Sequence, residues 1–435
     1  MNQELNQILI FSSQPNFAEI LSRLRFAVIH ATRFRIDSKE NEQLRSIIQD
    51  VMRNGDKAVQ KYTEKFDGIK LVPEQFLISK EALQKAHAEI DKELLTSIRS
   101  AIKNVRRYQE EIFIGDKSNH PGIKYTPIKR VGICVPGASA PLPSTVIMTA
   151  VPAQVAGVKE IVVVSPPRYN NSIHPVTLAV CNELGITEVY RIGGAQAVAA
   201  LARGTDTIRK VYKIVGPGNQ WVQMAKREVF GLVDIDSIAG PSEVLIIAND
   251  SANPAWVAAD MLSQFEHDPG SAVVLTDSQR LAEKVLNELK KQAAQLDRAD
   301  RIINCLKECS GIVVFENMTK VIEAANDFAS EHLEIQCGRQ SKEIADRIEN
   351  AGAIFIGDYS PVAVGDYWAG PSHTLPTGAT AKFFSPLSAN DFIKSTSIIE
   401  YDREKLAKSA VDIIRLAEAE GLDAHAKSIK IRLQS

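Results

Sequence analysis

The sequence predicts an α/β protein made of two doubly wound, incomplete Rossmann-like domains, with a helical N-terminal segment and a C-terminal tail. Short apolar runs alternate with helix-length segments from about residue 130, and a second set of this alternation begins at about residue 242. Apolar strands that alternate with helices indicate parallel sheets covered on both faces. The chain has 435 residues, which is too long for one ordinary core, so two or three domains are expected.

The first 130 residues are predicted to be mostly helical. Residues 41–68 and 79–112 carry apolar residues at helical spacing, and the first of these segments ends on Gly68. Ser79 can cap the start of the second segment, because its hydroxyl can accept a hydrogen bond from a backbone N–H of the first turn. These two segments are therefore expected to be helical before the first sheet begins.

The first alternation predicts a parallel sheet and its covering helices. Strands are expected at residues 130–137, 160–167, 188–194 and 211–218, and helices at residues 142–158, 175–185, 195–204 and 219–231. The second alternation predicts strands at residues 242–250, 271–278, 311–317, 332–337 and 352–358, with a helix after each of the first four. Residues 360–395 are rich in Gly, Pro, Ser and Thr and indicate an ordered functional loop, and the last 45 residues an amphipathic helix with a tail.

Composition and charge argue against several classes of protein. Hydrophobic residues make up 45% of the chain and charged residues 24%, which is typical of a soluble globular protein. The formal net charge is −2, and no long block of one sign indicates binding to nucleic acid or a membrane surface. No apolar segment is long enough to span a bilayer, and the first residues do not resemble a secretory signal. The five cysteines include no CxxC pair, which favours reduced thiols and a cytoplasmic location.

Glu331 and His332 are a candidate catalytic pair. They lie where an expected helix gives way to a strand, and such junctions form the ligand crevice at one edge of an open α/β sheet. A histidine beside a glutamate can supply a base and a carboxylate that activates water. The simpler alternative is an ion pair at the end of a helix.

Candidate metal ligands are scattered over the C-terminal half of the chain. Gln264 and His267 are three residues apart at an expected helix end, so they share a face, although a solvated helix end explains them equally well. Asp366 and His373 lie on a loop fixed by Gly and Pro residues, and His425 lies near the C-terminus. A set of Gln, His, Asp and His is one that zinc can accept. Spacing alone does not establish the site, because a decorative turn and a solvated tail are the competing explanations.

Two glycine loops could contact an anion. Residues 192–196 (IGGAQ) and 215–219 (VGPGN) each follow an expected strand and precede an expected helix, so each can present backbone N–H groups. Neither loop fits the GxGxxG pattern. Taken alone, the signal for a dinucleotide is therefore weak.

Seven motifs follow one another between residues 192 and 425: IGGAQAVAALA, VGPGNQWVQMAKREVFG, IAGPSEVL, SQFEHDP, ASEHLEI, GDYWAGPSHTLPTG and EGLDAH. In order and approximate spacing, these motifs resemble the histidinol dehydrogenase family. The resemblance implies an NAD-dependent oxidation of L-histidinol to L-histidine through L-histidinaldehyde, the last step of histidine biosynthesis. It also implies two NAD+ per reaction, one Zn2+ per subunit, and a homodimer in which the C-terminal tail reaches into the partner's active site.

Position by position, the resemblance implies roles for individual residues. The zinc ligands would be Gln264, His267, Asp366 and His425. His332 would be the general base, and Glu331 would activate water for the second oxidation. Contacts to the substrate would come from Ser242, Gln264, His267, His332, Asp366, His373, Glu420 and His425. Contacts to NAD would come from Gln196, Asn219 and the position of Cys134.

The expected domains combine the resemblance with the alternation of strands and helices. They are an N-terminal arm (residues 1–29), a discontinuous zinc and substrate domain (residues 30–132 and 242–387), an NAD-binding domain (residues 133–241) and a C-terminal helical tail for dimer contacts (residues 388–435). 

Three positions depart from the family's common residues, and they leave alternatives open. Cys134 stands where Tyr is common, Ala138 where Gly is common, and Ser372 where Asn is common. A related zinc- and NAD-dependent dehydrogenase of another small alcohol is one alternative. A zinc hydrolase in which Glu331 activates a metal-bound water is another, although the sequence has no HExxH motif. The third is an inactive, metal-stabilised dimer, against which the intact Glu331 and His332 argue.

Overall fold

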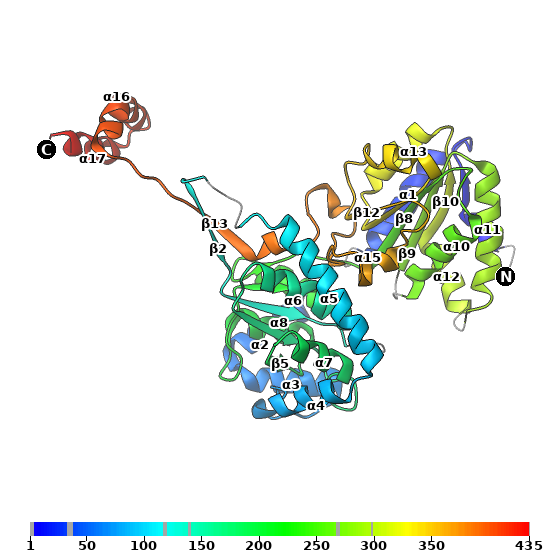
Figure 1. The fold of residues 1–435 in the computed structure, drawn as a ribbon, viewed down its shortest axis with the longest axis horizontal. Helices are drawn as coiled ribbons and strands as arrows, with labels where there is room; N and C mark the ends of the chain where they lie inside the picture. Colours follow the sequence, from blue (N-terminus) through cyan, green and yellow to red (C-terminus); the bar gives the residue numbers. More distant parts are fainter. Residues whose placement is uncertain are drawn as a thin grey trace. The chain divides into compact units, whose positions relative to one another are not determined.

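The protein has two compact units, which are described separately. The computed structural model describes residues 4–32, 38–115, 120–137, 141–266, 270–296 and 299–434. The first unit comprises Met1–Phe113 and Pro127–Phe392, and the second comprises Ile114–Thr126 and Ile393–Ser435. Two parallel sheets with helices lie in the first unit (Figure 1), which confirms the predicted α/β fold class.

The five-stranded sheet is doubly wound around β3. On one side of β3 lie β4 and then β5, and on the other side lie β6 and then β7, with every neighbouring pair parallel. The strands are β3 (Arg130–Cys134), β4 (Glu160–Val164), β5 (Glu188–Tyr190), β6 (Lys213–Val215) and β7 (Asp234–Ile235). The helices that follow them are α6 (Pro143–Val155), α7 (Pro175–Glu183), α8 (Gly194–Arg203) and α9 (Gln220–Val229). This is the strand order of dinucleotide-binding sheets.

The six-stranded sheet repeats this arrangement around β8. β9 and then β10 lie on one side of β8, β11 and then β12 lie on the other, and β1 extends the sheet beyond β10. The strands are β1 (Leu9–Phe11), β8 (Ser242–Ala248), β9 (Gly270–Thr276), β10 (Ser310–Val314), β11 (His332–Gln336) and β12 (Ala353–Ile356). The helices are α1 (Phe17–Thr32), α10 (Pro254–Ser263), α11 (Gln279–Ala293), α12 (Ala299–Cys309), α13 (Met318–Phe328), α14 (Ser341–Ala345) and α15 (Val362–Tyr367). Every neighbouring pair is again parallel.

The N-terminal helices pack with the five-stranded sheet, whereas the sequence assigned residues 30–132 to the other domain. These helices are α2 (Ser38–Asn54), α3 (Asp56–Asp67), α4 (Lys80–Glu89) and α5 (Lys92–Ile112), and they contact α6, α7, α8 and α9 (Figure 1). Leu44 and Val59 share a core with Val162 and Leu201. Conversely, β1 pairs with β10, so the arm belongs to the six-stranded sheet. An amphipathic pattern shows that a helix buries one face, but it does not show which sheet the helix packs against. The zinc, substrate and NAD roles assigned to the domains stay predictions.

Local signals at the helix ends behave as expected. Ser79 caps α4, because its hydroxyl accepts a hydrogen bond from Ala82 N at 3.2 Å. Gly68 ends α3 in the left-handed conformation with φ +72. The strands β1 and β7 were not predicted, since two or three residues at a sheet edge show no periodicity.

The second unit is small and its elements are short. β2 (Ile123–Pro127) pairs with β13 (Ile393–Ser397), and neither strand was predicted. The predicted C-terminal amphipathic helix is α16 (Arg403–Ala419), and α17 (Asp423–Leu433) packs against it.

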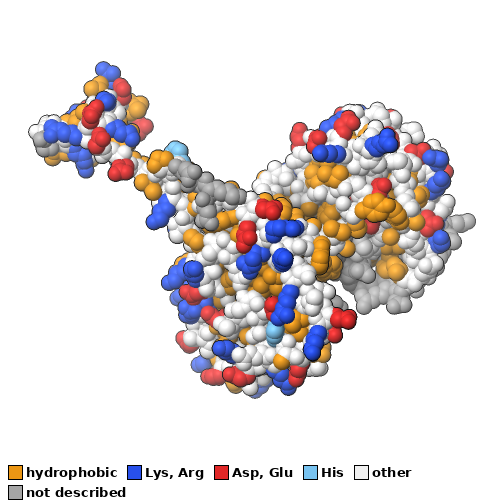
Figure 2. All heavy atoms as spheres, in the orientation of Figure 1, with side chains coloured by type: hydrophobic (Ala, Val, Ile, Leu, Met, Phe, Trp, Pro, Cys, Tyr) orange, Lys and Arg blue, Asp and Glu red, His pale blue; other side chains and the backbone are white. Residues whose placement is uncertain are grey.

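The surface carries charges of both signs. On the face shown in Figure 2, Lys and Arg side chains are interspersed with Asp and Glu side chains. Within the described ranges, no helix combines the length and the apolar character needed to cross a membrane.

A buried ion pair fixes the loop after β6. Lys226 of α9 is completely buried and pairs with Asp236. Its Nζ also donates to the carbonyl oxygen of Gly216 at 3.1 Å, and Gly216 N donates to Asp236 Oδ2 at 2.7 Å. Gly216 has φ +105, and a Cβ there would lie 2.3 Å from the carbonyl oxygen of Cys134. The ion pair therefore holds a close approach between the ends of β3 and β6 that only glycine permits.

Lys226→Met should destabilise the protein, because it leaves the Asp236 carboxylate buried without its cation. We expect the free energy of unfolding to fall by about 3–5 kcal/mol, which is typical when one partner of a buried ion pair is removed. Combining Lys226→Met with Asp236→Asn should restore much of the loss, since the amide oxygen can still accept from Gly216 N. Urea unfolding of both variants and the wild type measures this, and wild-type stability in Lys226→Met would contradict it.

Candidate active site and cofactor pocket

The predicted catalytic residues lie at the starts of two adjacent central strands. Ser242 and Glu243 begin β8, and Glu331 directly precedes His332, the first residue of β11. His332 is in register with Val244 of β8, so the two strand starts lie side by side. Ligands of open α/β sheets usually bind at the carboxyl ends of the strands. In the six-stranded sheet, the candidate site is instead at the amino ends.

Two buried glutamates bond to each other's backbone. Glu331 N donates to Glu243 Oε1 at 3.0 Å, and Glu243 N donates to Glu331 Oε2 at 2.9 Å. Gly378 N also donates to Glu243 Oε1 at 3.1 Å, and the Ser242 hydroxyl donates to Glu331 Oε2 at 2.8 Å. This reciprocal pair ties β8 to β11 and fixes the direction of both carboxyl groups. Glu243 was not among the predicted site residues, although a charged residue inside the apolar run SEVLIIA was a signal that could have identified it.

Burial raises the pKa of both carboxyl groups. It raises the pKa of Glu243 to about 8, and the nearby charge of Glu331 adds to the rise. It also raises the pKa of Glu331 to about 8, against the hydrogen bonds from Glu243 N and the Ser242 hydroxyl. Carboxyl groups that titrate near neutral pH can exchange protons during a reaction, and such shifts are common at active sites.

The partners of His332 define which ring nitrogen carries its proton. Nδ1 lies 3.1 Å from the carbonyl oxygen of Glu243 and 3.4 Å from Glu331 Oε2. A carbonyl oxygen only accepts, so the neutral ring is protonated at Nδ1. Burial lowers the pKa of His332, against the charge of Asp366, and this favours the neutral ring. Nε2 is buried without a hydrogen-bond partner among the described residues, and Asp366 Oδ1 is 3.9 Å away.

Two predicted zinc ligands lie on either side of the cluster formed by Ser242, Glu243, Glu331 and His332. Gln264 follows α10, and its Oε1 lies 3.0 Å from the Ser242 hydroxyl oxygen. Asp366 belongs to α15 and lies beside His332. Ser242 thus connects Gln264 to Glu331, and His332 connects Glu331 to Asp366. His373 is placed further along the loop, with Nε2 3.3 Å from the hydroxyl oxygen of Ser144.

A buried acidic pair connects the helices that carry these ligands. Glu334 Oε1 accepts from Val362 N, the first residue of α15, at 2.9 Å. Gln336 Nε2 donates to Glu334 Oε2 at 3.1 Å and to Asp260 Oδ2 of α10 at 2.7 Å. Burial raises the pKa of Glu334 well above its usual value and that of Asp260 as well, and the two carboxyl groups are hydrogen bonded. The pair therefore positions α15 relative to α10.

Several predicted residues are not brought into this cluster. His267 and Ala138 lie outside the described residues. Glu420 and His425 belong to the second unit, at the end of α16 and in α17. Among the residues that the structure describes, no group of three or more His, Cys, Asp or Glu side chains could hold a metal ion. The zinc assignment therefore stays a prediction.

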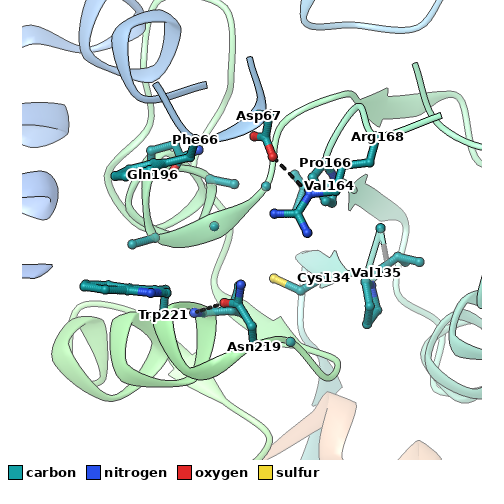
Figure 3. Close-up of a pocket in the computed structure, with 18 of the residues that line it drawn as sticks. Phe66, Asp67, Cys134, Val135, Val164, Pro166, Arg168, Gln196, Asn219 and Trp221 are labelled. Atoms are coloured by element: carbon teal, nitrogen blue, oxygen red, sulfur yellow. Dashed lines mark hydrogen bonds and ion pairs between the residues drawn. The ribbon is translucent and has the colours of Figure 1, made fainter. Parts of the chain in front are cut away.

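The three predicted NAD-contacting residues line one cavity of the five-stranded sheet. Cys134, Gln196 and Asn219 surround a pocket of about 410 Å³ at the carboxyl ends of the strands (Figure 3). Gln196 is buried, and neither its Nε2 nor its Oε1 has a hydrogen-bond partner among the described residues. An unpaired buried amide is costly unless a ligand satisfies it. Burial raises the pKa of the Cys134 thiol to about 12, so this cysteine is not a nucleophile.

Ser372, one of the three departures, has a structural role. Its hydroxyl is buried, donates to the carbonyl oxygen of Met148 at 2.9 Å, and accepts from Thr374 N at 3.1 Å. Cys134 is the departure that lines the cavity.

Known proteins resemble the chain along almost its full length. The family model of histidinol dehydrogenase matches residues 32–433. The histidinol dehydrogenase of Bacillus subtilis is 47% identical over 407 residues, covering 91% of this chain and 95% of that protein. The one from Rhodopirellula baltica is 46% identical over 399 residues, covering 90% and 86%. The crystal structure of histidinol dehydrogenase from Elizabethkingia anophelis has a TM-score of 0.88 at 33% identity and covers 98% of each chain.

Two doubly wound sheets, a buried Glu331–His332 pair and a pocket lined by glycines are features of an α/β enzyme, and the comparisons identify the class as an oxidoreductase. The chain belongs to the histidinol dehydrogenase family, which acts in amino-acid biosynthesis. The resemblance seen in the sequence motifs is thereby confirmed.

Glu334→Leu should slow turnover of L-histidinol, because it removes the acceptor that caps α15 and thereby loosens Asp366. We expect kcat to fall by about tenfold or more. Glu334→Gln should keep most of the activity, since its amide oxygen can accept from Val362 N and its NH2 group can donate to Asp260. Steady-state kinetics with circular dichroism as the folding control measure this. Equal activities of the Leu and Gln variants would exclude the positioning role.

Proposed function

We propose that the chain oxidises L-histidinol to L-histidine through L-histidinaldehyde, with two hydride transfers to NAD+ and one zinc ion per subunit. The observation that carries the proposal is the buried Nε2 of His332, which has no hydrogen-bond partner among the described residues and lies beside Glu331 and Asp366. An alcohol must lose a proton before it can release hydride, and a neutral imidazole is suited to accept that proton.

His332 acts as the base in both oxidation steps. Its Nδ1–H donates to the carbonyl oxygen of Glu243, so the ring cannot rotate away from the substrate. When Nε2 takes a proton, the carboxylate of Asp366 at 3.9 Å stabilises the imidazolium. The base is therefore held by the backbone of one strand and stabilised in its charged form by a side chain of α15.

Glu331 activates the water that hydrates the aldehyde. The Glu331 carboxyl group is oriented by hydrogen bonds from Glu243 N and the Ser242 hydroxyl to its Oε2. In its ionised form, which the raised pKa of about 8 places near and above that pH, a carboxyl group fixed next to the base can orient a water molecule for attack on a bound carbonyl. The hydrated aldehyde then resembles an alcohol, and His332 can serve a second time.

The residues present fit a zinc ion held by Gln264, His267, Asp366 and His425. Gln264 offers an amide oxygen and Asp366 a carboxylate, while the two histidines offer imidazole nitrogens, all of which zinc accepts. When bound, zinc supplies a positive charge that holds and orients the nitrogen atoms of the substrate. Ser242, His373 and Glu420 complete the proposed contacts to L-histidinol, together with His332 and the zinc ligands.

The cofactor and the partner complete the proposal. NAD+ binds the pocket of the five-stranded sheet, where the unpaired amide of Gln196 supports the assignment and Asn219 and Cys134 line the wall. The chain forms a homodimer in which Glu420 and His425 of one subunit enter the site of the other. We place the enzyme in the cytoplasm, with no nucleic acid and no membrane as partner.

Counting NADH per L-histidinol tests the reaction. The wild type should form two NADH for each L-histidinol consumed, and a zinc chelator should abolish this. In single-turnover measurements, Glu331→Gln should form the first NADH nearly normally and the second more slowly, by about 100-fold or more, since water is no longer activated. One NADH per substrate in the wild type, or full activity without zinc, would exclude the proposal. Equal slowing of both steps in Glu331→Gln would remove its assigned role.

Mixed dimers test the shared site. His267→Ala and His425→Ala should each be inactive, but co-refolding them in equal amounts should restore roughly a quarter of the wild-type activity, because one site of each mixed dimer carries neither change. Activity after mixing, with the dimer fraction measured by differential tagging, gives the result. Mixed dimers without recovered activity would place His425 in its own subunit's site or in none. Co-refolding His267→Ala with itself is the matched control.

A further inference from the structure

The loop after β3 is rich in proline, which cannot donate a backbone hydrogen bond. In doubly wound sheets, glycine N–H groups after the first strand and the N-terminus of the next helix cradle the pyrophosphate. Here the first strand is β3, and the segment between β3 and α6 contains Pro136 and Pro141, while α6 itself starts at Pro143. Proline has no backbone N–H to donate. Residues 193–197 and 218–219, at the starts of α8 and α9, also line the pocket, and a cationic side chain would give an anionic ligand a charged partner in addition.

Arg168 is the one cationic side chain among the described residues that line the pocket. It follows β4, the strand next to β3, and its side chain is 50% exposed. Its Nε donates to Asp67 Oδ1 at 3.3 Å. Figure 3 shows the guanidinium of Arg168 reaching toward the middle of the pocket, with Asp67 above it and joined to it by the dashed line. 

The contact with Asp67 orients the guanidinium. Asp67 ends α3, and its side chain is only 3% exposed. Burial raises the pKa of Asp67, and the hydrogen bond and charge of Arg168 oppose this. Because Nε is the atom that faces Asp67, the two terminal nitrogens of Arg168 remain for a ligand, and no described residue accepts from them. Two such donors in one plane match the geometry of a phosphate group.

We propose that Arg168, oriented by Asp67, binds the diphosphate of the dinucleotide and adds a charged partner beside β3, where prolines interrupt the run of backbone donors. The inference rests on the proposed function, in which this pocket holds NAD+. Apart from Asp67, whose carboxyl group pairs with Nε of Arg168, the other lining residues are apolar, glycine or amide residues, so Arg168 is the positive charge that a phosphate in this pocket can meet among the described residues. The ligand class is a nucleoside diphosphate, with the nicotinamide half not required for this contact.

Competition of ADP and adenosine with NAD+ distinguishes the loss of a phosphate contact from a change in the shape of the pocket, because only ADP carries phosphates. With the zinc-loaded enzyme, we expect Arg168→Gln to lower the affinity for NAD+ and for ADP by about 10- to 100-fold, which is the usual effect of losing hydrogen bonds to a charged group. Adenosine, which has no phosphate, should bind within about twofold of wild type. Arg168→Lys should be intermediate, because lysine keeps the charge but not the paired donors.

Two further variants keep the test decisive. Arg168→Gln alone leaves the Asp67 carboxylate buried without its cation, which could destabilise the fold. The double variant with Asp67→Asn removes that charge, so a loss of ADP binding in the double variant cannot be attributed to unfolding. Arg191→Gln is the matched control, since Arg191 follows β5 as Arg168 follows β4, but its Nε donates to the Gln75 carbonyl oxygen and it does not line the pocket. Arg191→Gln should bind all three ligands as the wild type does.

The outcomes are distinct. Loss of ADP and NAD+ binding with adenosine binding kept supports the inference. Equal losses of ADP and adenosine, or unchanged ADP binding, overturn it while leaving NAD+ as the cofactor. A wild type that binds neither NAD+ nor ADP overturns the inference and the proposed function of the pocket together, and the wild-type titration alone reveals this.

Discussion

The active-site region depends on the reciprocal hydrogen bonds between Glu243 and Glu331. Each carboxyl group accepts from the backbone N–H of the other residue, at 3.0 and 2.9 Å, so neither strand start can shift without breaking both bonds. The carbonyl oxygen of Glu243 then holds Nδ1 of His332. Placing two carboxyl groups in the interior is unfavourable by itself and raises the pKa of both to about 8. Such an arrangement is typical of a functional site and not of a core selected only for stability.

The two sheets share one strand order, but their candidate sites lie at opposite ends of the strands. Around β3, the loops at the carboxyl ends of the strands form the pocket that contains Gln196 and Asn219. Around β8, the candidate catalytic residues lie at the amino ends, where Ser242 and His332 begin their strands. A common architecture therefore does not determine where the reaction takes place.

The sequence predicted the fold class and the principal strands because apolar runs separated by helices are a strong local signal. It did not predict that α2 and α4 pack with the five-stranded sheet, since an amphipathic pattern carries no information about the partner surface. Glu331 and His332 were found because they are polar neighbours at an element junction. Glu243 was missed because its role appears only when β8 and β11 pair. The scattered zinc ligands could be proposed only from the resemblance, since their spacing along the chain does not define a site.

The protonation of His332 tests the central claim most directly. Nitrogen NMR of protein labelled at histidine, with His332→Asn used to assign its signals, reports which ring nitrogen carries the proton. At about pH 7 we expect a neutral ring protonated at Nδ1, with Nε2 unprotonated. A ring protonated at Nε2 alone, or an imidazolium at this pH, would contradict the account, because no lone pair would then face the substrate.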